Sequence, residues 1–202
     1  MRGLRISSKG YPVPFFVGYI NGEPDFRCID PQKLRRCMRE SRCWLCGHKL
    51  GIYRTYVIGP MCIVNRVSSE PPSHFDCARF AAQACPFLTL PHAHRREANM
   101  PSKAHAPPGI AITRNPGVVA LWTTPYPHKL MRAPDGVLFE VADAESVEWW
   151  SEGRTATYAE VRESFDSGVE ILRRVAAQQG PRALAALEWQ VTRAFGWLPM
   201  AA

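Results

Sequence analysis

The sequence CWLCGHKLG at residues 43–51 places Cys43 and Cys46 three positions apart and puts Gly47 directly after them. Glycine permits the tight turn that lets two neighbouring cysteine sulfurs face one point. Thiolate is a preferred ligand of zinc, and a Cys-x-x-Cys pair at such a turn is typical of one half of a four-ligand site. The stretch therefore predicts a metal-binding knuckle that needs a second pair of ligands later in the chain.

We expect that second pair in SHFDCARFAAQAC at residues 73–85. Ser73 is a natural N-cap, so His74 and Cys77 would lie in the first turn of a helix. Residues three apart on a helix project from the same side, and the positive end of the helix favours a thiolate. The sequence thus predicts a closed, structural Zn²⁺ site whose four ligands are Cys43, Cys46, His74 and Cys77.

The segment between the two ligand pairs has a strand-like composition. Two β-rich runs, IYRTYVI and CIVNRV, are split by Gly59-Pro60, which predicts a β-hairpin over residues 53–67. Cys62 would lie inside this hairpin, and Cys85 two turns further along the helix, where a buried thiol is expected. Whether Cys62 or Cys85 replaces one of the four ligands stays open.

The order of knuckle, hairpin and helix resembles the treble-clef family of zinc fingers over about residues 41–86. The resemblance implies a zinc-nucleated core and no particular activity, because treble clefs host many functions. A broader resemblance covers most of the chain: CWLCGHKLG, VIGPMCIVNRVSSEPPSHFDCARFAAQACPFL, RNPGV and WWSEGRTAT are similar to a family of uncharacterised proteins from bacteria and their phages. It implies that the chain is one intact protein encoded on a mobile genetic element, and it implies no particular reaction.

Around the zinc module we predict an α+β fold in three parts. Residues 1–88 would hold an N-terminal strand, a helix opened by Pro31 and the zinc module. Residues 89–109 lack periodicity and concentrate Pro, His and Ala, which is typical of an exposed linker. Residues 110–202 would form a small antiparallel sheet followed by a helical hairpin.

The last part carries several local signals. Asn115-Pro116-Gly117 predicts a hairpin, residues 136–141 a strand, and residues 144–151 a short helix. Thr157 and Glu160 form a Thr-x-x-Glu capping box before an apolar stripe of helical period. Gly180-Pro181 then ends that helix and begins another, so we expect two antiparallel helices at the C-terminal end.

The net charge of +7 is concentrated near the cysteines, because residues 1–60 carry 11 Lys or Arg against 4 Asp or Glu. A basic surface attracts polyanions such as nucleic acid. The first hypothesis is therefore a zinc-stabilised accessory protein that binds nucleic acid. The predicted phosphate-binding residues are Lys33, Arg35, Arg36, Arg39, Arg42, Lys49, Arg54 and Arg66.

The alternative hypothesis is a non-catalytic, phage-type interaction or inhibitor module that binds a host protein. Trp149-Trp150, followed by Arg154, is the pattern that suggests such a surface, since aromatic rings beside an arginine anchor partners. The other interpretation of the same pair is that one tryptophan fills the joint between the sheet and the C-terminal helices.

The sequence does not indicate a reaction. The segment 53–67 lacks the His, Asp or Glu that a nuclease on a treble-clef scaffold needs as a base, and no phosphate-binding or dinucleotide glycine motif is present. The seven cysteines without an export signal favour reduced thiols and metal ligands over disulfides. We therefore expect a cytoplasmic protein without membrane contact.

Overall fold

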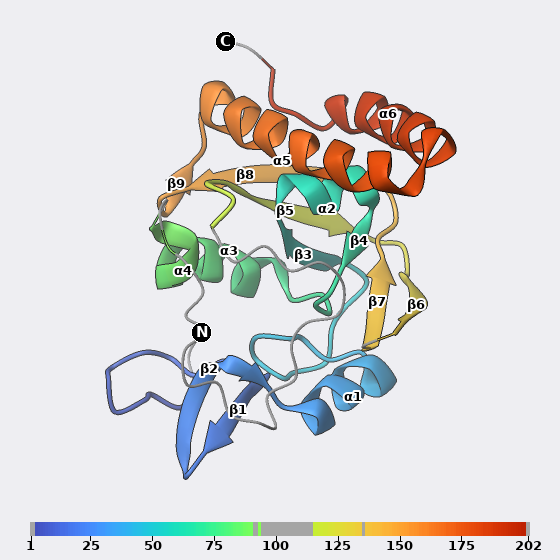
Figure 1. The fold of residues 1–202 in the computed structure, drawn as a ribbon. Coiled ribbons are helices and arrows are strands. Elements are labelled where there is room, and N and C mark those ends of the chain that lie inside the picture. The colour runs from blue at the N-terminus through green and yellow to red at the C-terminus, as the bar shows by residue number, and fades with distance from the viewer. Residues whose placement is uncertain (1–2, 91–92, 94–114, 135, 201–202) are drawn as a thin grey trace.

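The computed structural model describes residues 3–90, 93, 115–134 and 136–200, and Figure 1 traces the chain through them. The helices of the described residues are α1 Pro31–Glu40, α2 Pro60–Asn65, α3 Phe75–Ala84, α4 Pro86–Thr89, α5 Tyr158–Gln179 and α6 Pro181–Phe195. The strands are β1 Val17–Ile20, β2 Glu23–Ile29, β3 Arg54–Ile58, β4 Val67–Ser68, β5 Val119–Thr124, β6 Lys129–Ala133, β7 Gly136–Glu140, β8 Ser146–Ser151 and β9 Arg154–Thr155.

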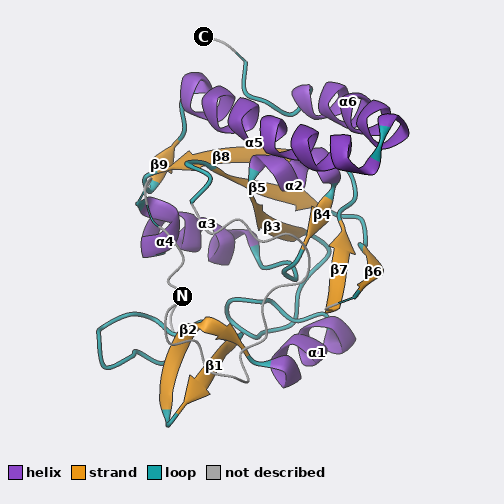
Figure 2. Cartoon of the chain, viewed as in Figure 1, coloured by secondary structure: helices purple, strands orange, loops and turns teal. Residues whose placement is uncertain are grey.

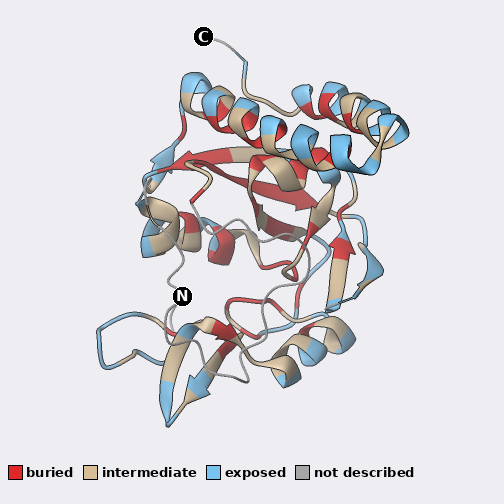
Figure 3. Ribbon diagram, viewed as in Figure 1, coloured by how far each residue is buried: buried red, intermediate tan, exposed pale blue. Residues whose placement is uncertain are grey.

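The centre of the molecule is a four-stranded antiparallel sheet in the order β3-β5-β8-β9. In Figure 2, α5 and α6 cover one face of it, while α3 and α4 lie on the other. Side chains alternate between the two faces of a strand. Ala120 and Trp122 of β5 accordingly join the core beneath α5 and α6, whereas Val119 and Leu121 pack against α3. Figure 3 shows the central strands buried and the outer surfaces of the helices exposed, as in a three-layer packing of helices, sheet and helices.

A second, smaller sheet has the order β4-β7-β6. It is joined to the centre through Phe139 of β7, which is fully buried in the main core. The short helix α2 precedes β4 and contacts α5 and α6 through Ile63 and Val64. The described part of the chain is therefore a mixed α and β structure with antiparallel sheets, as the α+β prediction requires.

The C-terminal helical hairpin forms where the sequence predicts it. Thr157 caps α5: its hydroxyl accepts from the Glu160 backbone N–H while the Glu160 carboxylate accepts from the Thr157 backbone N–H. Gly180 separates α5 from α6, with Pro181 at the first position of the second helix. These local signals suffice because a cap and a breaker act within a few residues.

The N-terminal segment folds as a β-hairpin and a helix beside the knuckle. Asn21 and Gly22 turn between β1 and β2 with positive φ, and Asp30 caps α1 by accepting from two backbone N–H groups. Phe15 N–H donates to the Leu45 carbonyl at 2.8 Å, which attaches this segment to the knuckle.

The predicted hairpin at residues 53–67 is wrong. Residues Pro60–Asn65 form helix α2, β3 pairs with β5, and β4 pairs with β7. Proline has no N–H for a strand ladder but suits the first position of a helix, and Arg66 in the left-handed conformation ends α2 after six residues. The apolar run CIV is therefore a buried helix face rather than a strand.

The predicted short helix at 144–151 is also wrong, because residues 146–151 form β8 in the centre of the sheet. Valine and tryptophan favour a strand when both of its faces are buried. The first arm of the hairpin predicted around residues 115–117 and most of the predicted linker 89–109 lie outside the described residues, whereas Asn115, Pro116 and Gly117 are described and lead into β5. The pairing of β3 with β5 places segments from the two sides of that linker in one sheet.

Candidate metal centre

Cys43, Cys46, His74 and Cys77 lie together, with their four ligand atoms all within 4.8 Å of one another. Cys46 Sγ is 3.3 Å from His74 Nδ1, and Cys77 Sγ is 3.9 Å from the same nitrogen. Tetrahedral bonds of about 2.0–2.3 Å put neighbouring ligand atoms roughly 3.5–3.8 Å apart. The four predicted ligands thus surround a space that fits one metal ion.

The knuckle depends on Gly47. Its φ of 76° is a conformation that glycine adopts without strain, and a Cβ there would lie 2.6 Å from Phe15 Cδ2. The turn is closed by Cys43 N–H donating to the His48 carbonyl at 2.7 Å and by Gly47 N–H donating to the Cys43 carbonyl at 2.9 Å. These bonds hold Cys43 and Cys46 on one turn.

His74 is the N-cap of α3, one residue later than predicted. Ser73 cannot take that place because its backbone N–H and carbonyl both pair with Thr55 of β3, at 2.8 and 2.9 Å. The shift leaves His74 and Cys77 on one side of the helix start. His74 Nε2 lies 3.0 Å from the Lys49 carbonyl, which turns Nδ1 toward the cysteines and gives the ring the outer hydrogen bond usual for a metal-bound histidine.

The thiols of the site have unequal proton affinities. A hydrogen bond from the Cys77 thiol lowers the pKa of Cys43 to about 4, and backbone N–H groups of Cys46 and His74 act in the same direction at 3.4 Å. The same hydrogen bond raises the pKa of Cys77, and burial raises that of Cys46. A bound cation would supply the positive charge that lets all three sulfurs ionise.

The two alternative ligands stay outside the cluster. Cys62 lies in α2 and Cys85 follows α3, and neither belongs to the group of four. Both cysteines are partly buried, and desolvation raises the pKa of Cys62 to about 11 and also raises that of Cys85. With four protein ligands a metal has no open position for water, so the arrangement can hold structure together but cannot activate a nucleophile.

Three of the predicted phosphate-binding residues converge on one carboxylate. Arg36, Arg39 and Arg42 lie 3.2, 2.7 and 2.6 Å from the Glu40 carboxylate. Their hydrogen bonds, that of Arg39 first, lower the pKa of Glu40 to about 2. The cluster therefore keeps two uncompensated positive charges at the end of α1. Arg35 and Lys49 are exposed nearby in sequence and have no carboxylate partner among the described residues.

The other three have backbone or local partners. Lys33 donates to the Val17 carbonyl at 2.7 Å and joins α1 to β1. Arg54 donates to the carbonyls of Ile52 and Pro125. Arg66 lies elsewhere: it contacts Asp143 at 2.6 Å and stacks 4.4 Å above the Trp122 ring, next to the second sheet. The structure thus does not bring Arg66 to the Glu40 cluster.

Trp149 and Trp150 do not form an exposed interaction surface. They are 5% and 7% exposed and point to opposite layers from β8, Trp149 toward α5 and α6 and Trp150 toward α3. Trp149 Nε1–H donates to the Trp197 carbonyl at 3.0 Å. The prediction of a surface pair is corrected because adjacent strand residues face opposite sides of a sheet that is covered on both.

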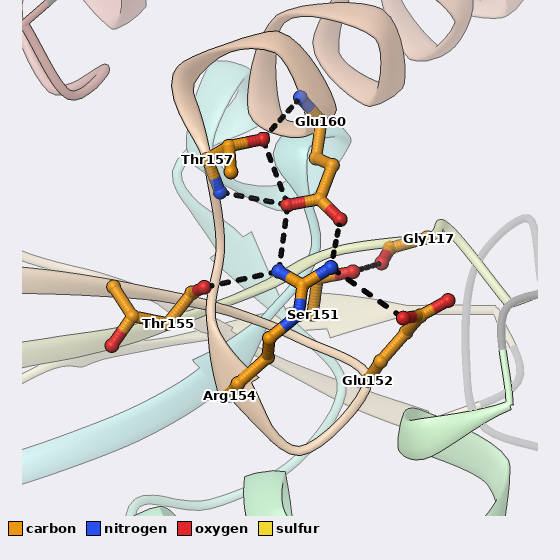
Figure 4. Close-up of polar contacts among 7 residues, drawn as sticks. All are labelled: Gly117, Ser151, Glu152, Arg154, Thr155, Thr157 and Glu160. Carbon is orange, nitrogen blue, oxygen red and sulfur yellow. Dashed lines mark hydrogen bonds and ion pairs between the residues drawn. The ribbon is translucent and has the colours of Figure 1, made fainter. Parts of the chain in front are cut away.

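Arg154 has a structural role. Figure 4 shows its guanidinium against the Glu160 carboxylate, at 2.6 and 3.0 Å, and toward Glu152 at 3.5 Å. Glu160 is also the acidic member of the capping box with Thr157. The arginine thereby fastens β9 to the first turn of α5.

Sequence reasoning missed one pair, Tyr56 and His128. The Tyr56 hydroxyl lies 2.7 Å from His128 Nδ1, across 72 residues. Burial lowers the pKa of His128, and the charge of Arg54 adds to the effect. No local pattern in TTPYPHKL (residues 123–130) indicates this contact, because it forms only when the chain at residues 127–128 folds back against Tyr56 of β3.

Comparison of the chain with protein-family models, curated proteins and solved structures gives no match. Within the described residues, no helix has the length and apolar character needed to cross a membrane.

Proposed function

We propose that the four-ligand centre binds one structural Zn²⁺. Three thiolates and one imidazole are the donor set that zinc prefers, and a harder ion such as Mg²⁺ or Ca²⁺ would require oxygen ligands. The hydrogen bond from His74 to Lys49 supports this assignment, because it orients the imidazole as a ligand. When bound, the zinc would tie the knuckle to α3 and thus the N-terminal segment to the central sheet.

We further propose that the protein binds nucleic acid through the basic surface that this centre fixes. The observation that carries the proposal is the convergence of Arg36, Arg39 and Arg42 on the single carboxylate of Glu40. Such a cluster holds its arginines in place while leaving net positive charge for phosphates. Arg39 is 75% exposed in its side chain and is the most accessible of the three.

The alternative function, docking of a host protein by a Trp149-Trp150 patch, loses its surface because both rings are buried. No other observation favours a particular protein partner. Catalysis is not part of the proposal either, since the closed centre has no position for a reacting water.

The test is fluorescence anisotropy with single- and double-stranded oligonucleotides over a series of salt concentrations. Binding through several phosphates should lose affinity with a log–log slope of about −0.7 to −0.9 per phosphate contact. The variant Arg35→Glu breaks no hydrogen bond or ion pair of the described residues and should lower affinity at least about threefold. Arg182→Glu on α6, at the opposite end of the molecule from α1 in Figure 1, is the matched control. Binding that ignores salt, or that falls equally in both variants, contradicts the proposal.

A further inference from the structure

A small pocket lies where the N-terminal segment meets the body of the protein. It has a volume of about 130 Å³, and its walls come from the end of α1, the knuckle, β3, β7 and the 127–128 loop. Two of the predicted phosphate-binding residues, Arg42 and Arg54, line it together with His128 and Ser41. The pocket therefore collects residues that sequence reasoning predicted to bind phosphate and a histidine that it missed.

His128 faces the pocket as a hydrogen-bond donor. Tyr56 is 1% exposed, and the only described acceptor for its hydroxyl hydrogen is His128 Nδ1. Since buried hydroxyl groups donate when an acceptor is in reach, Tyr56 donates to Nδ1 and the neutral ring carries its proton on Nε2. No described residue hydrogen-bonds Nε2, and this atom is not among the buried atoms that lack a partner. Nε2–H is thus accessible to a ligand.

The two arginines are held in position by carbonyl groups. Arg42 donates to the Gly47 carbonyl at 2.8 Å as well as to Glu40, and Arg54 donates to the carbonyls of Ile52 and Pro125. Arg54 has no carboxylate partner in the described part of the chain, so its charge is not neutralised locally. With the Ser41 hydroxyl, the pocket presents four donors and an excess of positive charge, which is the complement of an anion.

The size of the pocket limits the anion. With about 130 Å³ the pocket is smaller than the roughly 300–1,000 Å³ of sites that enclose drug-sized ligands. We therefore expect it to hold a group of the size of one phosphoryl rather than a base with its sugar. A terminal phosphate monoester has three free oxygens and a charge of about −1.5 to −2, whereas an internal phosphodiester has two free oxygens and a single negative charge, so the terminal group is the better complement of two arginines.

We propose that this pocket binds the terminal phosphate of a nucleic-acid strand, with Arg42, Arg54, Ser41 and His128 Nε2–H as donors. The proposal rests on the proposed function for the strand that carries the phosphate. The zinc centre would maintain the pocket, because it ties the knuckle to the central sheet. Arg42 directly precedes the proposed ligand Cys43, whereas Arg54 and His128 belong to the sheet side of the pocket.

The first experiment compares oligonucleotides of one sequence with a 5′-phosphate, a 3′-phosphate or hydroxyl groups at both ends. We expect the wild-type protein to prefer one phosphorylated end by at least about tenfold, the size of one charge-assisted hydrogen bond. Tyr56→Phe/His128→Phe should abolish that preference while keeping binding of the hydroxyl-ended strand. Arg54→Met should abolish the preference and also weaken all three strands, because Arg54 is one of the predicted phosphate-binding residues. Arg35→Glu should weaken all three strands equally and keep the preference. Thermal unfolding of each variant identifies loss through misfolding.

The second experiment titrates inorganic phosphate and a nucleoside 5′-monophosphate into the wild-type protein and follows the His128 ring signals by NMR. A saturable shift of His128 that disappears in Arg54→Met supports the pocket even if no oligonucleotide binds, in which case only the nucleic-acid function fails. Salt-sensitive strand binding with equal affinity for all ends and no His128 shift overturns the pocket and leaves the nucleic-acid function standing.

Discussion

Cys46 Sγ lies 3.3 Å from His74 Nδ1, although 28 residues separate the two in the chain. The contact joins the knuckle, which follows α1, to the start of α3 on the central sheet. The two regions that this contact joins, the knuckle region and the central sheet with its helices, are stabilised in different ways. The sheet and the α5–α6 hairpin share a large apolar core, whereas the knuckle region has a small cluster built around Cys43, Leu45, Leu50 and Cys77.

Removal of the proposed zinc ion should therefore loosen the molecule unevenly. Chelation, or Cys46→Ser, should unfold the segment from β1 to the knuckle, because structural zinc contributes on the order of 10 kcal/mol to small domains. The core beneath α5 and α6 should persist. Hydrogen exchange read by mass spectrometry, with zinc content from elemental analysis, measures both effects.

Cys85→Ser is the control for that experiment, since Cys85 is a thiol outside the cluster of four. It should keep one zinc per chain and normal exchange in the knuckle. Equal zinc loss in Cys85→Ser, or uniform unfolding on chelation, would contradict the assignment of ligands or the independence of the core.

Gly47→Ala should destabilise the protein more than Gly22→Ala. Both glycines have positive φ, 76° and 82°, so both substitutions cost about 1 kcal/mol of backbone strain. Only at Gly47 would the new Cβ meet the Phe15 ring, at 2.6 Å, and overpacking adds roughly 1–3 kcal/mol. Denaturant unfolding measures the difference, and adding Phe15→Ala to Gly47→Ala should recover part of it. Equal costs at both sites would exclude the clash.

The grouping of Cys43, Cys46, His74 and Cys77 was predictable because its evidence is local. Cys43 and Cys46 share a turn, His74 and Cys77 share a helix start, and each pair needs only a few residues to define its direction. The same holds for the α5 cap at Thr157 and the break at Gly180. Interactions between residues one or two turns apart depend on the local sequence and can therefore be predicted from it.

The failures concern residues whose structure depends on distant partners. The run Cys62-Ile63-Val64 has strand-like composition, yet the partner of β3 is β5, more than 60 residues later, and α2 instead packs its apolar residues under α5 and α6. Trp149 and Trp150 can lie in one strand because helices pack on both faces of the sheet, α5 and α6 against Trp149 and α3 against Trp150. The Tyr56–His128 contact likewise requires the completed sheet.

Burial separates the tryptophans into two groups with different expected effects. Trp149→Ala should cost about 3–5 kcal/mol, because it empties a site in the main core and removes the donor to the Trp197 carbonyl. Trp189→Ala should change the free energy of unfolding by no more than about 0.5 kcal/mol, since Trp189 is 61% exposed on α6. Urea unfolding of the two variants is the measurement, and similar losses would contradict the packing described.

The capping box of α5 gives a smaller, local prediction. Thr157→Ala removes the acceptor for the Glu160 backbone N–H and should cost about 1 kcal/mol. Thr192→Ala, whose hydroxyl donates within α6 to the Glu188 carbonyl, is a control at a surface position and should be nearly neutral. Thermal unfolding compares them. An equal shift of both melting temperatures would show that the cap is not the cause.

The ion pair between Arg154 and Glu160 predicts a dependence on pH. The hydrogen bond from Arg154 lowers the pKa of Glu160 from 4.5 to about 2, so the folded state holds fewer protons on this group than the unfolded state between these values. Its stabilising effect is thus complete above pH 4.5 and is lost as the pH falls toward 2. Glu160→Gln retains the capping geometry and removes the charge. Wild type should exceed this variant by at most about 1 kcal/mol at pH 7, because the pair is partly exposed. That difference should shrink toward zero near pH 2 in urea unfolding series, and a constant difference over the range would exclude the ion pair as its source.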